Sequence, residues 1–191
     1  MQDSITKLIN ESIQNFSKLS EDKSQLILIE EITNVIIKSF ENGNKLLICG
    51  NGGSAADAQH IAAELSGRFE IDRKPLNAEA LHVNSSYVTA VANDYGYDEI
   101  YSRMIQAKGQ KGDVLLALST SGNSKNVISA IEQANLNGLV TVGLSGSQGG
   151  DMQKLCKYNL IIPSNNTARI QEAHILVGHI ICKLIEQKMF A

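Results

Sequence analysis

One predicted helix carries His60 and Glu64 four residues apart, in a polar stripe that also includes Asp57 and Arg68. Residues three or four positions apart share a helix face. An imidazole and a carboxylate at this spacing can ligate one metal ion, or can act together as a proton-transferring pair. A solvated helix face is the ordinary explanation. Against it, the intervening residues are small or apolar, and the stripe begins next to a glycine-rich loop.

A second stripe lies in the C-terminal helical stretch, where Gln171 and His179 share a face and Glu172 and His174 lie beside it. A single histidine in a helix is more often structural than chemical. Two stripes that carry histidine and carboxylate on separate helices are of greater interest, but their spacing in the sequence cannot show that they meet.

The glycine-rich loop consists of Gly50, Asn51, Gly52, Gly53 and Ser54. Adjacent glycines and an asparagine permit positive φ and a close approach of the backbone to a ligand. Ser54 is placed to cap the helix that follows, and capping would explain the serine but not the glycines. The loop is neither a dinucleotide fingerprint nor a Walker loop, since no lysine follows it.

A second loop contains four hydroxyl side chains in six residues, namely Ser119, Thr120, Ser121 and Ser124. It precedes a predicted helix at residues 125–136, so hydroxyls and the free N–H groups of a helix N-terminus occur together. Capping would use only one or two hydroxyls, and the pattern therefore predicts a phosphate-binding loop. A third loop, residues 145–151, is similar, and we attribute it to loop flexibility and to a cap for a helix at Met152.

These loops follow short apolar runs that predict a sheet. The runs cover residues 46–49, 114–118, 139–142 and 160–162, with a weaker one at 78–83. Continuous apolar runs indicate strands covered on both faces, and hence a mostly parallel, five-stranded sheet in an α/β fold. Ligands of such sheets bind beyond the carboxyl ends of the strands. A long helix is expected from about residue 167 to residue 188.

Two helical patterns precede the sheet, one beginning near Asp3 and one from Ser20 to a stop at Gly43. The second is apolar on more than one face, which indicates burial on more than one side. A single sheet covers only one face, so we expect the other to pack against a second copy of the chain, and closed symmetry favours a dimer of dimers. We also expect the two histidine-bearing helices to meet near a subunit boundary, between chains rather than within one.

Composition limits the possible functions. The 191 residues are 43% hydrophobic and 19% charged, which suits a single domain, residues 1–191, with residues 1–43 as a helical extension packed on it. The net charge of −3 offers no basic surplus for nucleic acid. Cys49, Cys156 and Cys182 lack metal-binding spacing, and no apolar segment resembles a membrane span or signal peptide. We therefore expect a cytoplasmic protein with reduced thiols and no membrane partner.

Five motifs carry a resemblance to a known family. They occupy residues 50–54, 57–65, 92–96, 119–124 and 168–174. In this order and spacing they resemble the phosphoheptose isomerases of the SIS (sugar isomerase) domain superfamily, and the likeness extends from the N-terminal helices to Phe190. The hydroxyl-rich loop alone would indicate only an SIS domain, whereas the full set, with Glu64 and His179, is specific.

The resemblance implies a three-layer αβα sandwich with a flavodoxin-like parallel sheet, and a homotetramer. It implies conversion of sedoheptulose 7-phosphate to D-glycero-D-manno-heptose 7-phosphate, the first step toward nucleotide-activated heptose for lipopolysaccharide cores or other surface glycans. Residues 72–76 depart from the family's usual Arg-Pro pattern, which concerns the local loop rather than the chemistry.

The resemblance also implies site residues. The substrate-binding set is Asn51, Gly52, Gly53, Ser54, Asn93, Asp94, Ser119, Thr120, Ser121, Ser124 and Gln171, with residues 119–124 holding the phosphate. Family members bind zinc, and the matching ligands are His60, Glu64, Gln171 and His179.

The implied reaction suits two of these side chains. Interconversion of a ketose and an aldose moves a proton between C1 and C2 through a cis-enediol. We expect Glu64 to be the base, because a partly desolvated carboxylate can accept a proton from carbon, and His179 to exchange protons with the oxygens, because histidine titrates near neutrality. A metal ion can polarise the carbonyl. A carboxylate bound tightly to zinc is a weaker base, so Glu64 cannot serve both roles fully at once.

Three alternatives use the same loops. A non-catalytic SIS paralogue that binds the replication initiator would be expected to lack the Glu64 and His179 pair. A sugar-phosphate-sensing regulator would need a DNA-binding module, for which the 191 residues leave no room. An SIS isomerase of another sugar phosphate is excluded only weakly.

Overall fold

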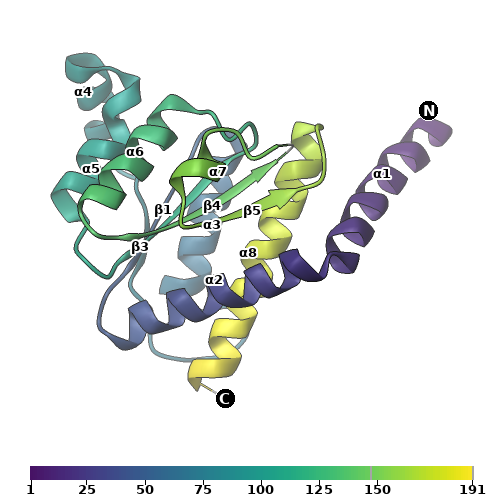
Figure 1. The fold of residues 1–191 in the computed structure, drawn as a ribbon, viewed down its shortest axis with the longest axis horizontal. Helices are drawn as coiled ribbons and strands as arrows, with labels where there is room; N and C mark the ends of the chain where they lie inside the picture. Colours follow the sequence, from purple (N-terminus) through teal and green to yellow (C-terminus); the bar gives the residue numbers. More distant parts are fainter. Residues whose placement is uncertain (147, 191) are drawn as a thin grey trace.

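A computed structural model describes residues 1–146 and 148–190, so Ser147 of the third loop lies outside the described residues. Five strands form one sheet in the order β2-β1-β3-β4-β5, and every neighbouring pair is parallel (Figure 1). The strands are β1 (Leu46–Gly50), β2 (Ala78–Ala80), β3 (Val114–Ser119), β4 (Val140–Gly146) and β5 (Tyr158–Ile162). The predicted five-stranded parallel sheet is confirmed, and the weak fifth strand is only three residues long.

Eight α-helices accompany the sheet in the described part of the chain. They are α1 (Gln2–Glu21), α2 (Lys23–Glu41), α3 (Gly53–Ser66), α4 (Ser85–Tyr95), α5 (Ile100–Lys108), α6 (Lys125–Leu136), α7 (Met152–Leu155) and α8 (Thr167–Phe190). A short 3₁₀ helix, Tyr97–Glu99, links α4 to α5.

The sheet separates two hydrophobic cores, as expected for a three-layer αβα sandwich. Leu46 and Ile48 of β1 pack with α2, α3 and α8, whereas Leu47 and Cys49 pack with α4, α5 and α6. Successive side chains of a strand point to opposite faces, so a fully apolar strand is what two covered faces require. The predicted sandwich is confirmed.

The N-terminal helices divide two residues later than expected. Asp22 caps α2 by accepting hydrogen bonds from the backbone N–H groups of Ser24 and Gln25, whereas the Ser20 hydroxyl bonds back to the Ser17 carbonyl inside α1. The prediction that Ser20 begins the second helix is therefore wrong, because its hydroxyl is used within the preceding turn. Gly43 follows α2 at a φ of +75°, as expected of a helix stop.

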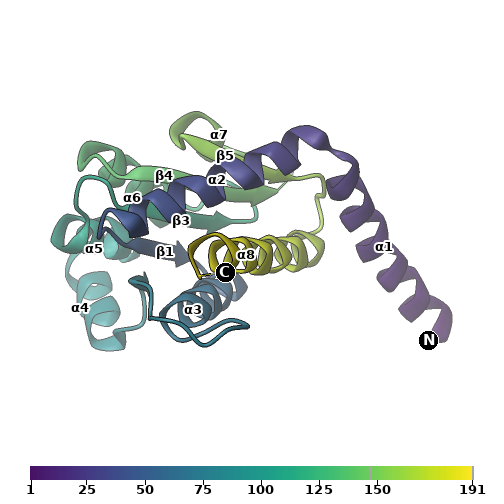
Figure 2. The same cartoon turned by 90° about the horizontal axis from the view of Figure 1, so that it is seen from below.

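The helix α2 lies along the sheet, but α1 projects away from it (Figures 1 and 2). The helix α1 contacts α8 through three hydrogen bonds: Ser12 donates to Glu172, Asn15 donates to the Arg169 carbonyl, and the Leu8 carbonyl accepts from Arg169. One face of α1 carries an apolar stripe in which each side chain is more than half exposed. The stripe consists of Ile5, Leu8, Ile9 and Ile13.

The register of the strands brings the predicted ligand loops to one edge of the sheet. Gly50 of β1 pairs with Leu118 of β3, and Ser119 of β3 pairs with Ser145 of β4. The glycine-rich, hydroxyl-rich and third loops thus leave adjacent strands at nearly the same level. Within residues 1–146 and 148–190, every helix is too short or too polar to cross a membrane.

Candidate active site

The glycine-rich loop leads directly into α3. Gly52 precedes the helix with a φ of +56°, and a Cβ placed on Gly53 would lie 2.5 Å from Nε2 of Gln171. Glycine at position 53 lets the Gln171 side chain of α8 lie directly against the loop, and a larger residue there would displace that side chain. The prediction that Ser54 caps the helix is wrong: α3 begins at Gly53, no side chain caps it, and Ser54 is buried in its first turn.

Asn51 forms a double hydrogen bond with Asn126 of α6. Each amide nitrogen donates to the other's oxygen, over 2.8 and 2.9 Å, and Asn126 is buried. The Tyr97 hydroxyl also donates to Asn51 Oδ1 over 3.3 Å. The sequence patterns do not predict a role for Asn126 or Tyr97. The one hint in the sequence is that asparagine has a poor helix propensity, so an asparagine within a predicted helix suggests a specific hydrogen-bonding role for Asn126.

The hydroxyl-rich loop gathers its side chains at the N-terminus of α6. Ser119 Oγ lies 3.0 Å from Ser124 Oγ and 3.4 Å from Ser121 Oγ. Ser124 precedes α6 but its side chain does not cap the helix. An adjoining pocket of about 350 Å³ is lined by Thr120, Ser121, Asn165, Thr167 and Ile170. Clustered hydroxyls at a helix N-terminus can hold one phosphate group.

The third loop supports the hydroxyl-rich loop. Gly122 has a φ of +69°, and a Cβ there would collide with the Gly149 backbone. The Asn123 side chain accepts a hydrogen bond from the Asp151 N–H over 2.9 Å. Asp151 precedes the four-residue α7 without capping it through its side chain, so the predicted capping role is wrong and the described part of this loop is a buttress.

Asn93 and Asp94 lie exposed in the last turn of α4 and hydrogen-bond to each other over 2.8 Å. No hydrogen bond within the described chain joins them to the other predicted site residues. The chain that follows them reaches the glycine-rich loop through Tyr97.

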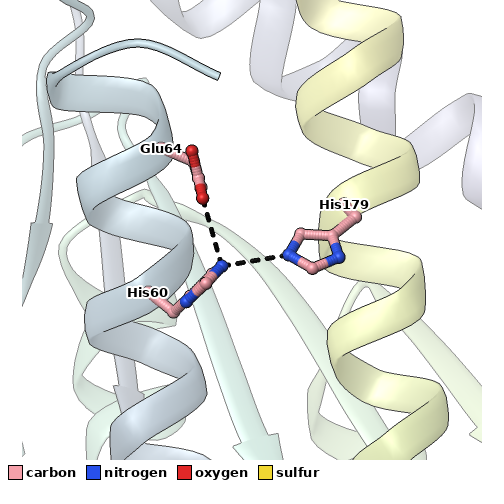
Figure 3. Close-up of side chains that lie close together, drawn as sticks. All are labelled: His60, Glu64 and His179. Atoms are coloured by element: carbon pink, nitrogen blue, oxygen red, sulfur yellow. Dashed lines mark hydrogen bonds and ion pairs between the residues drawn. The ribbon is translucent and has the colours of Figure 1, made fainter. Parts of the chain in front are cut away.

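His60, Glu64 and His179 converge between α3 and α8 (Figure 3). His60 Nε2 lies 3.1 Å from Glu64 Oε1 and 3.0 Å from His179 Nε2. Side-chain exposure is 50% for His60 and 24% for Glu64. All three belong to one chain, so the expectation that the two helices meet between subunits is wrong. The helices α3 and α8 are neighbours on the same face of the sheet, and sequence spacing carries no information on that proximity.

The three ligand atoms of this cluster fit a metal ion. They lie within 4.8 Å of one another. Two imidazole nitrogens and a carboxylate oxygen are a zinc donor set, and bonds of about 2.0–2.2 Å in a tetrahedron put ligand atoms about 3.4 Å apart. The two separations from His60 Nε2, 3.0 and 3.1 Å, are close to this value. Two ring nitrogens that face each other otherwise need one shared proton between them.

Asp57 lies one turn before His60 on α3. Its Oδ2 is buried and makes no hydrogen bond in the described structure. Burial raises the pKa of this carboxyl above its ordinary value, while nearby His60 and His179 act in the opposite direction. Arg68, the last member of the stripe, lies exposed beyond the end of α3.

The polar residues of the α8 stripe make contacts in different parts of the structure. Gln171 lies against Gly53, two turns before His179. His174 is fully buried, its Nε2 lies 3.2 Å from the Ser145 carbonyl oxygen, and burial lowers its pKa to about 4. Glu172 pairs with Arg169. His179 is thus the one histidine of α8 that reaches the cluster.

This architecture, with a hydroxyl-rich loop at the carboxyl edge of a five-stranded parallel sheet, is that of an SIS domain. The model of the SIS domain family matches residues 9–146. The matched segment contains the glycine-rich loop, the hydroxyl-rich loop and the α3 stripe.

Full-length relatives narrow the class. A phosphoheptose isomerase of Aneurinibacillus thermoaerophilus is 48% identical over 190 residues, which cover 100% of this chain and 96% of the relative. The solved structure of the Neisseria gonorrhoeae phosphoheptose isomerase is 38% identical, with 97% of this chain and 98% of that chain covered and a TM-score of 0.92. The Francisella tularensis enzyme is 36% identical over the same shares, with a TM-score of 0.93. The chain belongs to the phosphoheptose isomerases.

Proposed function

We propose that the protein is an aldose–ketose isomerase that converts sedoheptulose 7-phosphate to D-glycero-D-manno-heptose 7-phosphate. The observation that carries the proposal is the convergence of Glu64 and His179 in a chain of this family. By this activity the protein would begin the supply of activated heptose for lipopolysaccharide cores or other surface glycans, in the cytoplasm.

The phosphate would bind at Ser119, Thr120, Ser121 and Ser124, against the N-terminus of α6. From Gly53, at the start of α3, to His60 is a rise of about 10 Å. An extended seven-carbon sugar phosphate has a comparable length, so its reacting end could reach the cluster. The proposed substrate-binding residues along this path would be Asn51, Gly52, Gly53, Ser54 and Gln171, and Asn93 and Asp94 would complete the set.

In the forward direction, Glu64 would accept a proton from C1 while His179 donates one to the carbonyl oxygen at C2, which yields the cis-enediol. His179 would then take the proton from the hydroxyl at C1, and Glu64 would return its proton to C2. One proton moves between carbons and one between oxygens, so no oxidant is needed. The partial burial of Glu64 suits a carboxylate that accepts a proton from carbon.

We further propose that His60, Glu64 and His179 hold zinc, with Gln171 as a fourth ligand implied by the resemblance. A bound zinc ion would polarise the substrate carbonyl. In the structure the Gln171 side chain packs against Gly53 of the glycine-rich loop. It would have to move away from Gly53 to become a ligand of the cluster.

We also propose a homotetramer. The exposed stripe of Ile5, Leu8, Ile9 and Ile13 on α1 supports it, because monomeric proteins rarely leave a contiguous apolar surface uncovered. Light scattering tests the assembly, and a monomeric mass at micromolar concentration contradicts it.

The activity is tested by incubation with sedoheptulose 7-phosphate, with the product identified by NMR. We expect D-glycero-D-manno-heptose 7-phosphate. If that substrate is untouched while another ketose phosphate is isomerised, the protein is an SIS isomerase of a different sugar. If no sugar phosphate turns over, the proposal is wrong.

A further inference from the structure

The loop between α3 and β2 is fastened to α8 by an ion pair that is nearly inaccessible to solvent. Arg73 Nε lies 3.0 Å from Glu186 Oε1, and both side chains are only 2% exposed. The two residues are 113 positions apart in the sequence. We call them the Arg73–Glu186 latch.

The Glu186 carboxylate binds backbone as well as arginine. It accepts hydrogen bonds from the N–H groups of Phe69, Glu70 and Ile71, over 3.1, 2.9 and 3.3 Å. Three consecutive N–H groups and one guanidinium therefore hold a single carboxylate, and they fix the path of the loop just after α3. Hydrogen bonds to a charged group are stronger than neutral ones.

The Arg73 guanidinium closes the C-terminus of α3. It donates to the carbonyl oxygens of Glu64, Leu65 and Gly67, over 2.8, 2.7 and 3.2 Å. The last carbonyls of a helix have no partner within the helix, and a positive charge at that end is favourable. The arginine thus adds to the cap formed by Gly67, whose N–H bonds to the Ala63 carbonyl, and it holds the turn that carries Glu64.

The latch is connected to both members of the proposed proton-transfer pair, Glu64 and His179. Its arginine binds the backbone of Glu64, and its glutamate holds Phe69, whose ring stacks on His179 with centroids 5.7 Å apart and an interplanar angle of 25°. One buried pair therefore fixes the backbone beneath the carboxylate and the ring beside the imidazole.

Stability alone is a poor explanation for such a pair. A buried ion pair gains little over well-packed apolar side chains, because both charges lose their hydration. The pair instead fixes geometry, because the planar guanidinium has donors in fixed positions and so determines where the three carbonyl oxygens lie.

We propose that Arg73 and Glu186 are positioning residues, which set the separation and orientation of Glu64 and His179. The proposal rests on the isomerase activity proposed above. It also gives a role to Arg73 within residues 72–76, the segment that departs from the family pattern.

The test compares Glu186→Gln and Arg73→Lys with the wild type. Glu186→Gln is nearly isosteric and removes the negative charge, whereas Arg73→Lys keeps the positive charge and removes the planar guanidinium. We expect kcat to fall about 10- to 100-fold, as for a small misplacement of reacting groups. The KM should change little, because the phosphate loop lies at the far end of α3. Zinc affinity, measured by competition with a chelator, should fall about 10- to 100-fold, as for other residues that orient ligands.

A matched control lies beside the latch. Lys183 and Glu70 also join α8 to this loop, but their side chains are 41% and 50% exposed. Glu70→Gln should leave kcat and zinc affinity near wild type, because exposed pairs contribute little.

The proposal is overturned if Glu186→Gln and Arg73→Lys lower the melting temperature while kcat and zinc affinity stay unchanged. It is also overturned if neither variant folds, since the pair is then structural. An inactive wild type would contradict the proposed activity, and zinc affinity would still decide whether the latch positions the cluster.

Discussion

The two halves of the candidate site are built in different ways. At the carboxyl edge of the sheet, the glycine-rich and hydroxyl-rich loops are shaped by backbone turns and by contacts between neighbouring segments, such as Gly122 against Gly149. Between α3 and α8, the cluster of His60, Glu64 and His179 depends on side chains that project from two regular helices. The loops are therefore shaped mainly by the backbone of facing turns, whereas the reactive cluster is formed by side chains of two packed helices. If this division is real, damage to one half should leave the other intact.

The largest effect should come from Glu64→Gln. The change is nearly isosteric and removes the proton acceptor, so turnover should fall about 10²- to 10⁴-fold. Exchange of solvent deuterium into C1 or C2, followed by NMR, measures the lost step directly. Substrate binding by calorimetry should persist. Glu41→Gln, at the exposed end of α2, is the control. Exchange at the wild-type rate would show that Glu64 is not the base.

Phosphate binding should be weakened by the double substitution of Ser119 and Ser124 by alanine. Each lost hydrogen bond to a charged phosphate should cost about 1.5–3 kcal/mol, which corresponds to a KM about 100-fold higher or more. Once substrate saturates, kcat should remain near wild type. Ser20→Ala, on exposed α1, serves for comparison. Unchanged affinity in the double variant would assign the phosphate to another loop.

A third prediction concerns His174, which lies behind the loops and takes no part in the chemistry. Burial lowers its pKa to about 4 from an ordinary value of 6.5, so the folded state favours the neutral ring. The associated stability is fully present above pH 6.5 and is lost as the pH falls toward 4, up to about 3 kcal/mol. Urea titrations across this range should give a shallower pH dependence for His174→Gln than for the wild type. Equal slopes would contradict the assignment.

The smallest effect is expected from mixing subunits. Inactive Glu64→Gln and inactive His179→Gln chains should regain no activity after subunit exchange, because both residues lie in one chain and every site then lacks one of them. Exchange is verified by mass spectrometry of tagged copies. Recovered turnover would mean that neighbouring chains share the pair.

The same division explains what the sequence could predict. The strands, the three loops and the shared face of His60 and Glu64 follow from apolar runs and helical spacing, which are local properties. The convergence with His179 is not local, because α8 lies more than a hundred residues further along the chain.

The errors have related causes. Ser20 and Ser54 both have residue types that cap helices, but their hydroxyls are placed by the surrounding turns, and Asp22 and Gly52 occupy the capping positions instead. The Asn51–Asn126 pair joins segments 75 positions apart, which no pattern in one sequence encodes.

The projecting helix α1 has a consequence for how the molecule behaves on dilution. Its first half, with Ile5, Leu8 and Ile9 exposed, contains no buried residue, and an isolated helical segment shorter than about 12–15 residues is marginal in water. If copies associate through this stripe, the fraction of chains in which α1 is ordered depends on the protein concentration. Amide hydrogens of residues 2–13 should therefore exchange faster as the protein is diluted, while those of β1 and β3 keep their protection at every concentration.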